Sequence, residues 1–303
     1  MRPHDFSLRQ LQYVVAVADT LGFHKAAARC NVSQPTLSAQ IQQLERVLGV
    51  TLFERDRRRV LVTDAGRAVA ARARQVLVDV DDLLAVSKGA QDALQGTLRV
   101  GVIPTVAPYL LPDITPAVAA AHPRLTLIFR EEKTETIVRE LGEGALDAGI
   151  VALEADLGDC AHAAIFRDAF VAALPKSHPL ARKRRLTVDD LATSEVLLLD
   201  DGHCFRTQAL ALCSRGGARE TAFRATSLST LAQMVSVGTG MTLLPELSVA
   251  VENRRGQLAI RPFVAPVPGR TIALVWRRRS PIAPALTRLA ATLRTAVLAR
   301  GAA

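Results

Sequence analysis

Hydrophobic and polar positions near the N-terminus follow helical spacing in two short segments, joined by a three-residue turn within residues 23–42. In the second segment, large apolar residues recur at intervals of 4, 3 and 4, which predicts a helix with one face toward the core. These residues are Leu37, Ile41, Leu44 and Leu48. Asn31 tolerates a left-handed backbone at the turn, and Ser33 is a good N-cap. The pattern predicts a helix-turn-helix, the motif that places a helix in the major groove of DNA.

The opposite face of this helix carries small and polar side chains that suit DNA. Glutamine can bond base edges, serine and threonine can reach phosphates, and proline can touch a thymine methyl group. Strand patterns at 51–53 and 60–62 flank an arginine-rich tip, which predicts a wing along the phosphates. The alternative is an ordinary solvated face and turn. The expected DNA-binding residues are Ser33, Gln34, Pro35, Thr36, Ser38, Gln42, Arg46, Arg57 and Arg58.

A longer helix is expected from residue 64 to about residue 88, with apolar residues at heptad spacing. Its seam consists of Val69, Ala73, Val76, Val80 and Leu83. A seam of this kind needs a partner helix, so we expect the helix to join two subunits. The alternative is a single helix packed on its own domain.

From Gly96 onward, short apolar runs alternate with helix patterns. Strands are expected at 97–103, 125–130, 148–153, 170–175, 195–200, 221–226, 241–245 and 272–277, with a terminal helix at 284–299. The alternation predicts a parallel sheet with helices on both faces, in two α/β subdomains that enclose a cleft. Ligands of such sheets bind at the carboxyl ends of strands, where Thr105 falls.

These patterns divide the chain of 303 residues into three parts. Residues 6–63 are expected to form a winged helix-turn-helix, 64–92 a dimerising helix and 93–303 an α/β domain. Within this α/β domain, which the resemblance described below identifies as a sensor domain, subdomain I should span about 93–165 and 268–303, and subdomain II about 166–267.

The amino-acid composition says less about function than the hydrophobic pattern does. Lys and Arg number 38 against 29 Asp and Glu, a formal charge of +9 that favours an anionic partner. Much of this excess lies at 182–185 and 277–279, far from the helix-turn-helix. Neither a membrane span nor a signal peptide is expected, so the predicted location is the reducing cytoplasm. Stable structural disulfides are rare there, and the four cysteines lack zinc-site spacing, so no metal is expected.

Two of these cysteines, Cys204 and Cys213, lie nine residues apart in a segment with a helix pattern. A continuous helix would separate them by about 13 Å along its axis, whereas a disulfide needs Cα atoms within about 7 Å. Helix and bond therefore exclude each other, as a redox switch requires. A helix N-terminus and Arg206 both favour a reactive thiolate at Cys204, whereas Asp200 and Asp201 oppose it. His203 could donate a hydrogen bond to peroxide or polarise the thiol. Ordinary core packing is the alternative.

The chain resembles LysR-type transcriptional regulators over essentially its whole length. The matching motifs are AAARCNVSQPTLSAQIQQLE, LGVTLFER, VTDAG and VGTGMTLLPE, the last at 237–246. The resemblance implies an α/β chain with an N-terminal winged helix-turn-helix, a dimerising linker helix and a periplasmic-binding-protein-like sensor domain. It also implies a homodimer or homotetramer on pseudo-palindromic promoter DNA, with RNA polymerase as a partner and without catalytic activity or a cofactor.

A narrower resemblance is to the hydrogen-peroxide-responsive activators of this family. It rests on GVIPTVAPYLLP, LLLDDGHCFRTQALALC and SLSTLAQMVSVGTGMTLLPEL. It implies that Cys204 reacts with peroxide and Cys213 resolves the sulfenic acid into a reversible disulfide. It further implies a pocket of Thr105, Thr134, His203 and Arg206 around the thiol. The chain departs from this pattern at Phe205 and Thr207, where a smaller aliphatic residue and an acid are more common.

Two other functions stay open at this stage. The regulator could respond to a small organic ligand in the cleft, with Thr105 as an anion contact. The chain could also be a thiol peroxidase fused to a DNA module. The enzyme is less favoured, because one oxidation per subunit is enough to switch a regulator.

Overall fold

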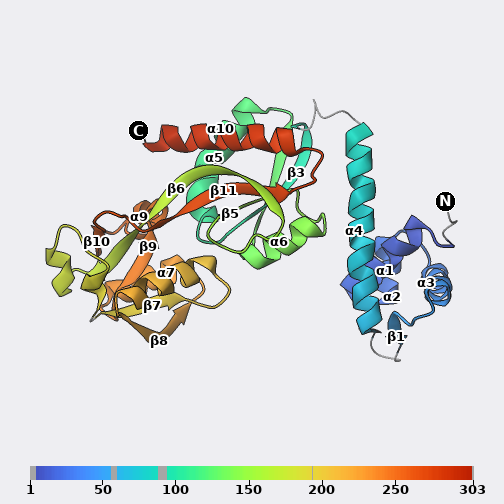
Figure 1. Ribbon diagram of the computed structural model, residues 1–303, viewed down its shortest axis with the longest axis horizontal. Helices are drawn as coiled ribbons and strands as arrows, with labels where there is room; N and C mark the ends of the chain where they lie inside the picture. The colour runs from blue at the N-terminus through green and yellow to red at the C-terminus, as the bar shows by residue number, and fades with distance from the viewer. Residues whose placement is uncertain (1–4, 56–59, 88–93, 193, 302–303) are drawn as a thin grey trace. The chain divides into compact units, whose positions relative to one another are not determined.

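The computed structural model describes residues 5–55, 60–87, 94–192 and 194–301. The chain divides into two compact units, one of residues 1–89 with 142–144 and one of residues 90–141 with 145–303 (Figure 1). Over the described ranges, no helix combines the length and the apolar character that crossing a membrane requires.

The N-terminal unit contains the predicted helix-turn-helix. Its elements are α1 (Leu8–Thr20), α2 (Phe23–Arg29), α3 (Gln34–Leu48), β1 (Phe53–Arg55), β2 (Val60–Val62) and α4 (Asp64–Ser87). Asn31 adopts a left-handed backbone with φ of 54°, and the Ser33 side chain caps α3 by accepting a hydrogen bond from the Thr36 amide. Both local predictions are confirmed. β1 and β2 form the predicted antiparallel pair, whereas Arg57 and Arg58 at its tip lie outside the described residues.

The apolar face of α3 forms the centre of this unit's core. Leu37, Ile41 and Leu44 are fully buried, as predicted. Leu48, however, is 36 % exposed, so its predicted burial is wrong. It is the last residue of α3, and Gly49 then turns the chain through a left-handed conformation.

Helix α4 divides the predicted heptad seam between two environments. Ala73 is buried, and α4 packs along α1 within the same unit. In contrast, Val76 is 41 % exposed and Leu83 is 68 % exposed. One part of the seam therefore belongs to the core of this unit, and the rest is an apolar strip on its surface.

The C-terminal unit alternates strands and helices. Its first half comprises β3 (Gly96–Val102), α5 (Ala107–Ala121), β4 (Leu125–Glu131), α6 (Thr134–Gly142), β5 (Ala148–Ala152) and β6 (Cys160–Pro175). There follow η2 (Pro179–Arg182), η3 (Asp189–Leu191), β7 (Glu195–Leu199), α7 (Cys204–Arg215), β8 (Arg219–Ala225) and α8 (Leu228–Ser236). The last elements are β9 (Thr242–Pro245), α9 (Glu246–Glu252), β10 (Leu258–Pro262), β11 (Gly269–Arg277) and α10 (Ala283–Gly301). Sequence patterns missed α9 and β10, which are both short.

The main sheet is mixed, so the prediction of a parallel sheet is only partly correct. Its strands follow the order β10-β6-β11-β5-β3-β4, and β9 pairs with β6. β3 is parallel to both β4 and β5, but β11 is antiparallel to β5 and β6. The reason is connectivity, because β6 carries the chain out of one subdomain and β11 brings it back.

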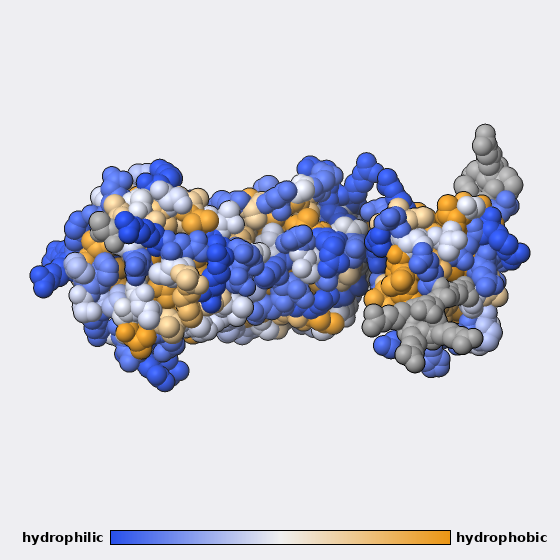
Figure 2. Space-filling model, turned by 90° about the horizontal axis from the view of Figure 1, so that it is seen from below, coloured by the Kyte–Doolittle hydropathy of each residue, from blue (hydrophilic) through white to orange (hydrophobic). Residues whose placement is uncertain are grey.

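Two hydrophobic cores lie along these crossing strands, which run side by side between the two subdomains in Figure 1. On β6, Ile165 belongs to the core of subdomain I, whereas Phe170 belongs to that of subdomain II. The strand therefore passes from one core to the other within a few residues. Figure 2 shows mostly hydrophilic residues on the visible face of this unit, with hydrophobic ones in small separate patches.

Two glycines let α6 pack closely on the sheet. A Cβ atom on Gly149 would lie 2.5 Å from a methyl group of Ile137, and one on Gly101 would lie 2.8 Å from the same side chain. Ile137 is fully buried on α6. Glycine in β3 and β5 thus sets the height of α6 above the sheet, and with it the position of Thr134 at the start of the helix.

We expect Gly149→Ala to push α6 outward and to lower the free energy of unfolding by about 1–3 kcal/mol, because the added methyl group overpacks the site. Chemical denaturation of the full-length protein measures the change. The control is Gly142→Ala, where a Cβ meets nothing within 4 Å. Equal stability of both variants would contradict the expectation.

Candidate functional site

The starts of α6 and α7 line one hollow of about 570 Å³ in the C-terminal unit. Thr134 is the first residue of α6, and Cys204 is the first of α7. The lining also includes Gly202, His203 and Thr207. Three of the predicted site residues, Thr134, His203 and Cys204, therefore border the same space. Because both helices begin here, unpaired backbone amides favour negative charge in this region.

The two cysteines of interest lie on one unbroken helix. Cys204 is half-buried, Cys213 is buried, and both are free thiols. Nine residues of α-helix separate them by about 13 Å along the axis. Burial raises the pKa of the Cys213 thiol to about 12, so this thiol is neutral at physiological pH. The predicted incompatibility between helix and disulfide therefore applies to the actual fold.

Polar groups around the hollow include one buried hydroxyl without a partner. Thr134 is 6 % exposed, and its Oγ1 has no hydrogen-bond partner in the structure. Next to it, Lys133 donates a hydrogen bond from Nζ to the Asp201 carbonyl at 2.7 Å, which brings a positive charge to the rim. Sequence reasoning missed Lys133, although it directly precedes Thr134. An unpaired buried hydroxyl of this kind can bond a small polar molecule.

His203 precedes Cys204 as the N-cap residue of α7 and is buried. Burial lowers the pKa of its imidazole, Lys133 lowers it further, and Asp200 opposes this shift. The ring is therefore neutral near pH 7, with one N–H donor and one acceptor nitrogen. It can thus donate to, or accept from, a molecule beside Cys204.

Arg206 points away from the hollow toward β7 and β8. It donates from Nε to Asp201 Oδ1 at 2.8 Å, and from Nη1 to Glu220 Oε1 at 2.8 Å and to the Leu199 carbonyl at 3.1 Å. Hydrogen bonding by Glu220 raises the pKa of this guanidinium. Arg206 therefore fixes the first turn of α7 to the neighbouring strands and does not line the hollow.

Thr105 is also outside the lining. It is 3 % exposed, and Arg270 donates from Nη1 to its Oγ1 at 2.7 Å and from Nη2 to its carbonyl at 3.1 Å. A guanidinium has no acceptor, so the Thr105 hydroxyl proton stays available to another acceptor. Thr105 thus belongs to a buried network centred on Arg270.

Arg270 and Asp168 form a buried ion pair that sequence reasoning missed. Their side chains are 0 % and 1 % exposed, with Nη2 at 3.0 Å from Oδ2. The two residues face each other in the antiparallel register of β11 and β6. Asp168 also accepts a hydrogen bond from the Leu247 amide at the start of α9. The sequence offered one faint signal, a single arginine at the start of an apolar strand pattern.

Seven of the predicted DNA-binding residues lie on α3 or at its N-cap, whereas Arg57 and Arg58 lie outside the described residues. At its start, Ser33, Gln34, Pro35 and Thr36 are exposed, as are Gln42 and Arg46 farther along, whereas Ser38 is half-buried. Arg46 donates from Nε to the Gln42 carbonyl at 3.4 Å. The outward face of α3 therefore presents amide, hydroxyl and guanidinium groups from a rigid, capped helix.

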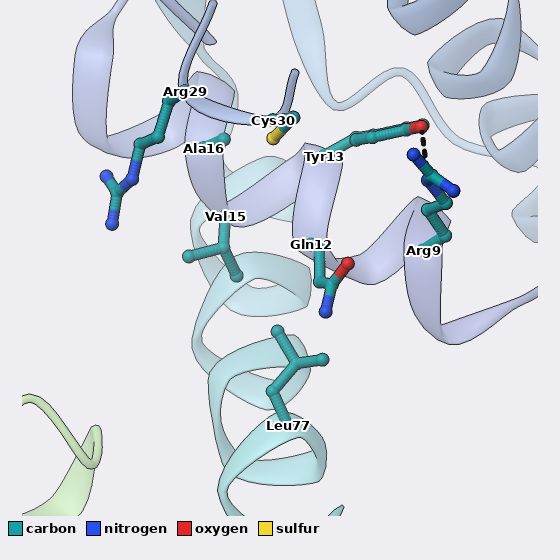
Figure 3. A pocket seen from close by; sticks show the side chains of 8 residues that line it. All are labelled: Arg9, Gln12, Tyr13, Val15, Ala16, Arg29, Cys30 and Leu77. Carbon is teal, nitrogen blue, oxygen red and sulfur yellow. Dashed lines mark hydrogen bonds between the residues drawn. The ribbon is translucent and has the colours of Figure 1, made fainter. Parts of the chain in front are cut away.

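A second hollow, of about 460 Å³, lies in the N-terminal unit between α1, α2 and α4 (Figure 3). Arg9 donates from Nε to the Tyr13 hydroxyl at 2.9 Å at one side, Arg29 lies at the opposite side, and Leu77 of α4 lies below Gln12 in this view. Cys30 is half-buried here, and burial raises the pKa of its thiol. It is the C-cap residue of α2 and packs against the core of this unit.

Comparison with protein families covers both units. Residues 8–67 match the model described as "Bacterial regulatory helix-turn-helix protein, lysR family", and residues 91–298 match "LysR substrate binding domain". The chain belongs to the LysR family. This LysR family protein is therefore a transcriptional regulator with a DNA-binding helix-turn-helix, and not an enzyme.

Curated relatives align along nearly the whole chain. A "Hydrogen peroxide-inducible genes activator" of Pectobacterium carotovorum subsp. carotovorum is 43% identical over 289 residues, which cover 95% of this chain and 96% of the relative. The "DNA-binding transcriptional dual regulator OxyR" of Escherichia coli (strain K12) is 42% identical over 289 residues and covers 95% of each chain.

Solved structures of OxyR proteins share the fold. A full-length OxyR variant from Pseudomonas aeruginosa has a TM-score of 0.80 at 34% identity and covers 96% of each chain. A mutant OxyR of Corynebacterium glutamicum, described as H2O2-bound, has a TM-score of 0.67 at 34% identity and covers 98% of this chain and 94% of that chain.

The raised pKa of Cys213 makes the free energy of unfolding depend on pH in the alkaline range. The unfolded thiol ionises near its ordinary value of 9.0, while the folded one stays neutral to about 12, so unfolding releases a proton in this range. The free energy of unfolding should therefore fall as pH rises through this range. Denaturation of the reduced protein measures it. In Cys213→Ala the fall should be smaller, and an identical pH dependence in both proteins would exclude this origin.

Proposed function

We propose that this LysR family regulator senses hydrogen peroxide at Cys204 and signals by forming a reversible disulfide with Cys213. The observation that carries the proposal is the placement of both thiols on α7, one in a hollow that Thr134 and His203 also line and the other buried. The similarity to hydrogen peroxide-inducible genes activators supports peroxide as the signal.

The chemistry proceeds in two balanced steps. The Cys204 thiol attacks one peroxide oxygen, the O–O bond breaks, and the products are a sulfenic acid and one water molecule. The Cys213 thiol then displaces the sulfenic hydroxyl as a second water molecule, which forms the S–S bond. Peroxide takes up two electrons and the two thiols lose two. Cytoplasmic reductants return the disulfide to thiols, so the proposal places the protein in the cytoplasm.

In this proposal, peroxide binds in the hollow beside Cys204. The unpartnered Thr134 hydroxyl and the neutral His203 ring offer hydrogen bonds to its two oxygens. Thr105 and Arg206 take supporting roles from outside the lining. Arg206 holds the first turn of α7, and Thr105 lies in the buried network around Arg270.

DNA binding follows from the N-terminal unit. We place α3 in the major groove and the wing along phosphates, with two subunits joined through the apolar strip of α4. A symmetric dimer reads a pseudo-palindromic promoter site, and a homotetramer and RNA polymerase complete the proposed assembly. The division into 6–63, 64–92 and 93–303 stays the proposed domain organisation.

The second candidate, a small organic ligand in the cleft, has less support. It depends on Thr105 as an anion contact, but Thr105 is 3 % exposed and Arg270 occupies both its hydroxyl and its carbonyl oxygen. An anionic ligand that accepts the remaining hydroxyl proton would have to reach this buried side chain, which does not line the hollow.

We expect Cys204→Ser to keep DNA binding and to lose every peroxide-dependent change, because the reacting sulfur is absent. In Cys213→Ser, oxidation should stop at the sulfenic acid of Cys204. Mass spectrometry after stoichiometric peroxide, together with footprinting on promoter DNA, measures both. Cys160→Ser is the matched control, since Cys160 is half-buried in β6, and it should respond like the native protein. A normal peroxide response in Cys204→Ser would contradict the proposal.

On α3, we expect Gln42→Ala to relax base preference at one position of each half-site, at a cost of about 1–3 kcal/mol, because an amide that reads a base edge is lost. The salt dependence of binding should stay unchanged, whereas Arg46→Ala should reduce its slope by about one phosphate contact. Titrations of operator variants at several salt concentrations separate these effects. Gln75→Ala, an exposed glutamine of α4, is the control.

A further inference from the structure

The first turn of α7 is anchored in both cores of the C-terminal unit at once. Cys204 packs against the core of subdomain I, whereas the next residue, Phe205, is 2 % exposed within the core of subdomain II. Adjacent Cα atoms are about 3.8 Å apart, so neither side chain can travel far without the other. Any movement of Cys204 therefore acts directly on the packing of Phe205.

The Phe205 ring lies between a second aromatic ring and a buried cation. It contacts Phe170 of β6 edge-on, with ring centroids 5.1 Å apart and an interplanar angle of 83°. The guanidinium carbon of Arg270 lies 5.3 Å from the centroid of the Phe205 ring, within the range of a cation–π interaction. Phe205 thus covers a charge that the protein has removed from water.

Arg270 in turn connects the segments that join the two subdomains. It pairs with Asp168 across the crossing strands β11 and β6 and donates to the Thr105 hydroxyl and carbonyl in the loop after β3. Asp168 accepts the Leu247 amide at the start of α9. The cation under the Phe205 ring therefore fixes the crossing strands to elements on either side of them.

A bond between Cys204 and Cys213 must close a separation of about 13 Å to within about 7 Å. We propose that Phe205 is the positioning residue that reports this event: its ring leaves Arg270 when Cys204 moves, which exposes the Arg270–Asp168 pair and loosens the crossing strands. This inference rests on the disulfide proposed above.

Hydrogen–deuterium exchange of the full-length protein tests the inference, with peptides that cover 103–107, 166–171 and 268–273. In the native protein, oxidation should speed exchange in these peptides by about tenfold. The variant Phe205→Leu fills much of the same volume but has no ring. Its reduced form should already exchange faster there, and oxidation should add little.

The matched control is Phe263→Leu, which makes the same change at a fully buried phenylalanine in the same core. The backbone of Phe263 forms an isolated β-bridge with that of Leu186, so this residue belongs to a different part of the core from the Arg270 network. It should lose stability without faster exchange in the three peptides. Mass spectrometry of the same samples keeps the two proposals apart. If the native protein forms no Cys204–Cys213 disulfide, the proposed function fails. If the disulfide forms but the peptides exchange as before, Cys213 moves alone and Phe205 has no such role. Phe205 also has no such role if the three peptides exchange at the same rate in Phe205→Leu and Phe263→Leu.

Discussion

An α-helix keeps residues nine positions apart at a fixed separation, and the function proposed for the C-terminal unit depends on this constraint in α7. Because Cys204 and Cys213 share this helix, the thiols stay apart for as long as its backbone hydrogen bonds hold. A shorter spacing on a flexible loop would let the sulfurs meet without consequence for the fold. In the proposed switch, the helix converts a local oxidation into a change of shape, since the new covalent bond and the old hydrogen bonds cannot coexist.

The buried ion pair of Arg270 and Asp168 is the part of the structure on which the proposed rearrangement of α7 acts. Charges removed from water require close partners, and deleting one member of such a pair costs about 3–5 kcal/mol because the other is left uncompensated. Here, the remaining donors of Arg270 go to Thr105, and the aromatic face of Phe205 covers it. A network that is satisfied on every side is rigid, but it loses much of its stability when one covering group leaves. This makes the crossing strands sensitive to the position of α7.

Local signals in the sequence predicted the elements well, and long-range pairing explains what they missed. The turn at Asn31, the cap at Ser33 and the burial of Leu37 follow from neighbouring residues, so the helix-turn-helix could be derived directly. The partnership of Arg270 with Asp168 could not, because strand register joins residues that are 102 positions apart. For Arg206, helix geometry alone predicts that its side chain points away from that of Cys204. Two residues past Cys204 correspond to about 200° around a helix, so both side chains could not face one hollow.

The reduced form of α7 also carries internal costs that bring the two states of the switch closer in free energy. Both polar atoms of the Gln208 side chain are buried without a partner, as is the Thr221 hydroxyl on the neighbouring β8. Each unsatisfied group of this kind costs about 1–3 kcal/mol in the folded state. Because these side chains leave α7 less well satisfied than its backbone suggests, the helix offers less resistance to the proposed disulfide than a fully satisfied helix would. Reduction can then restore the helix.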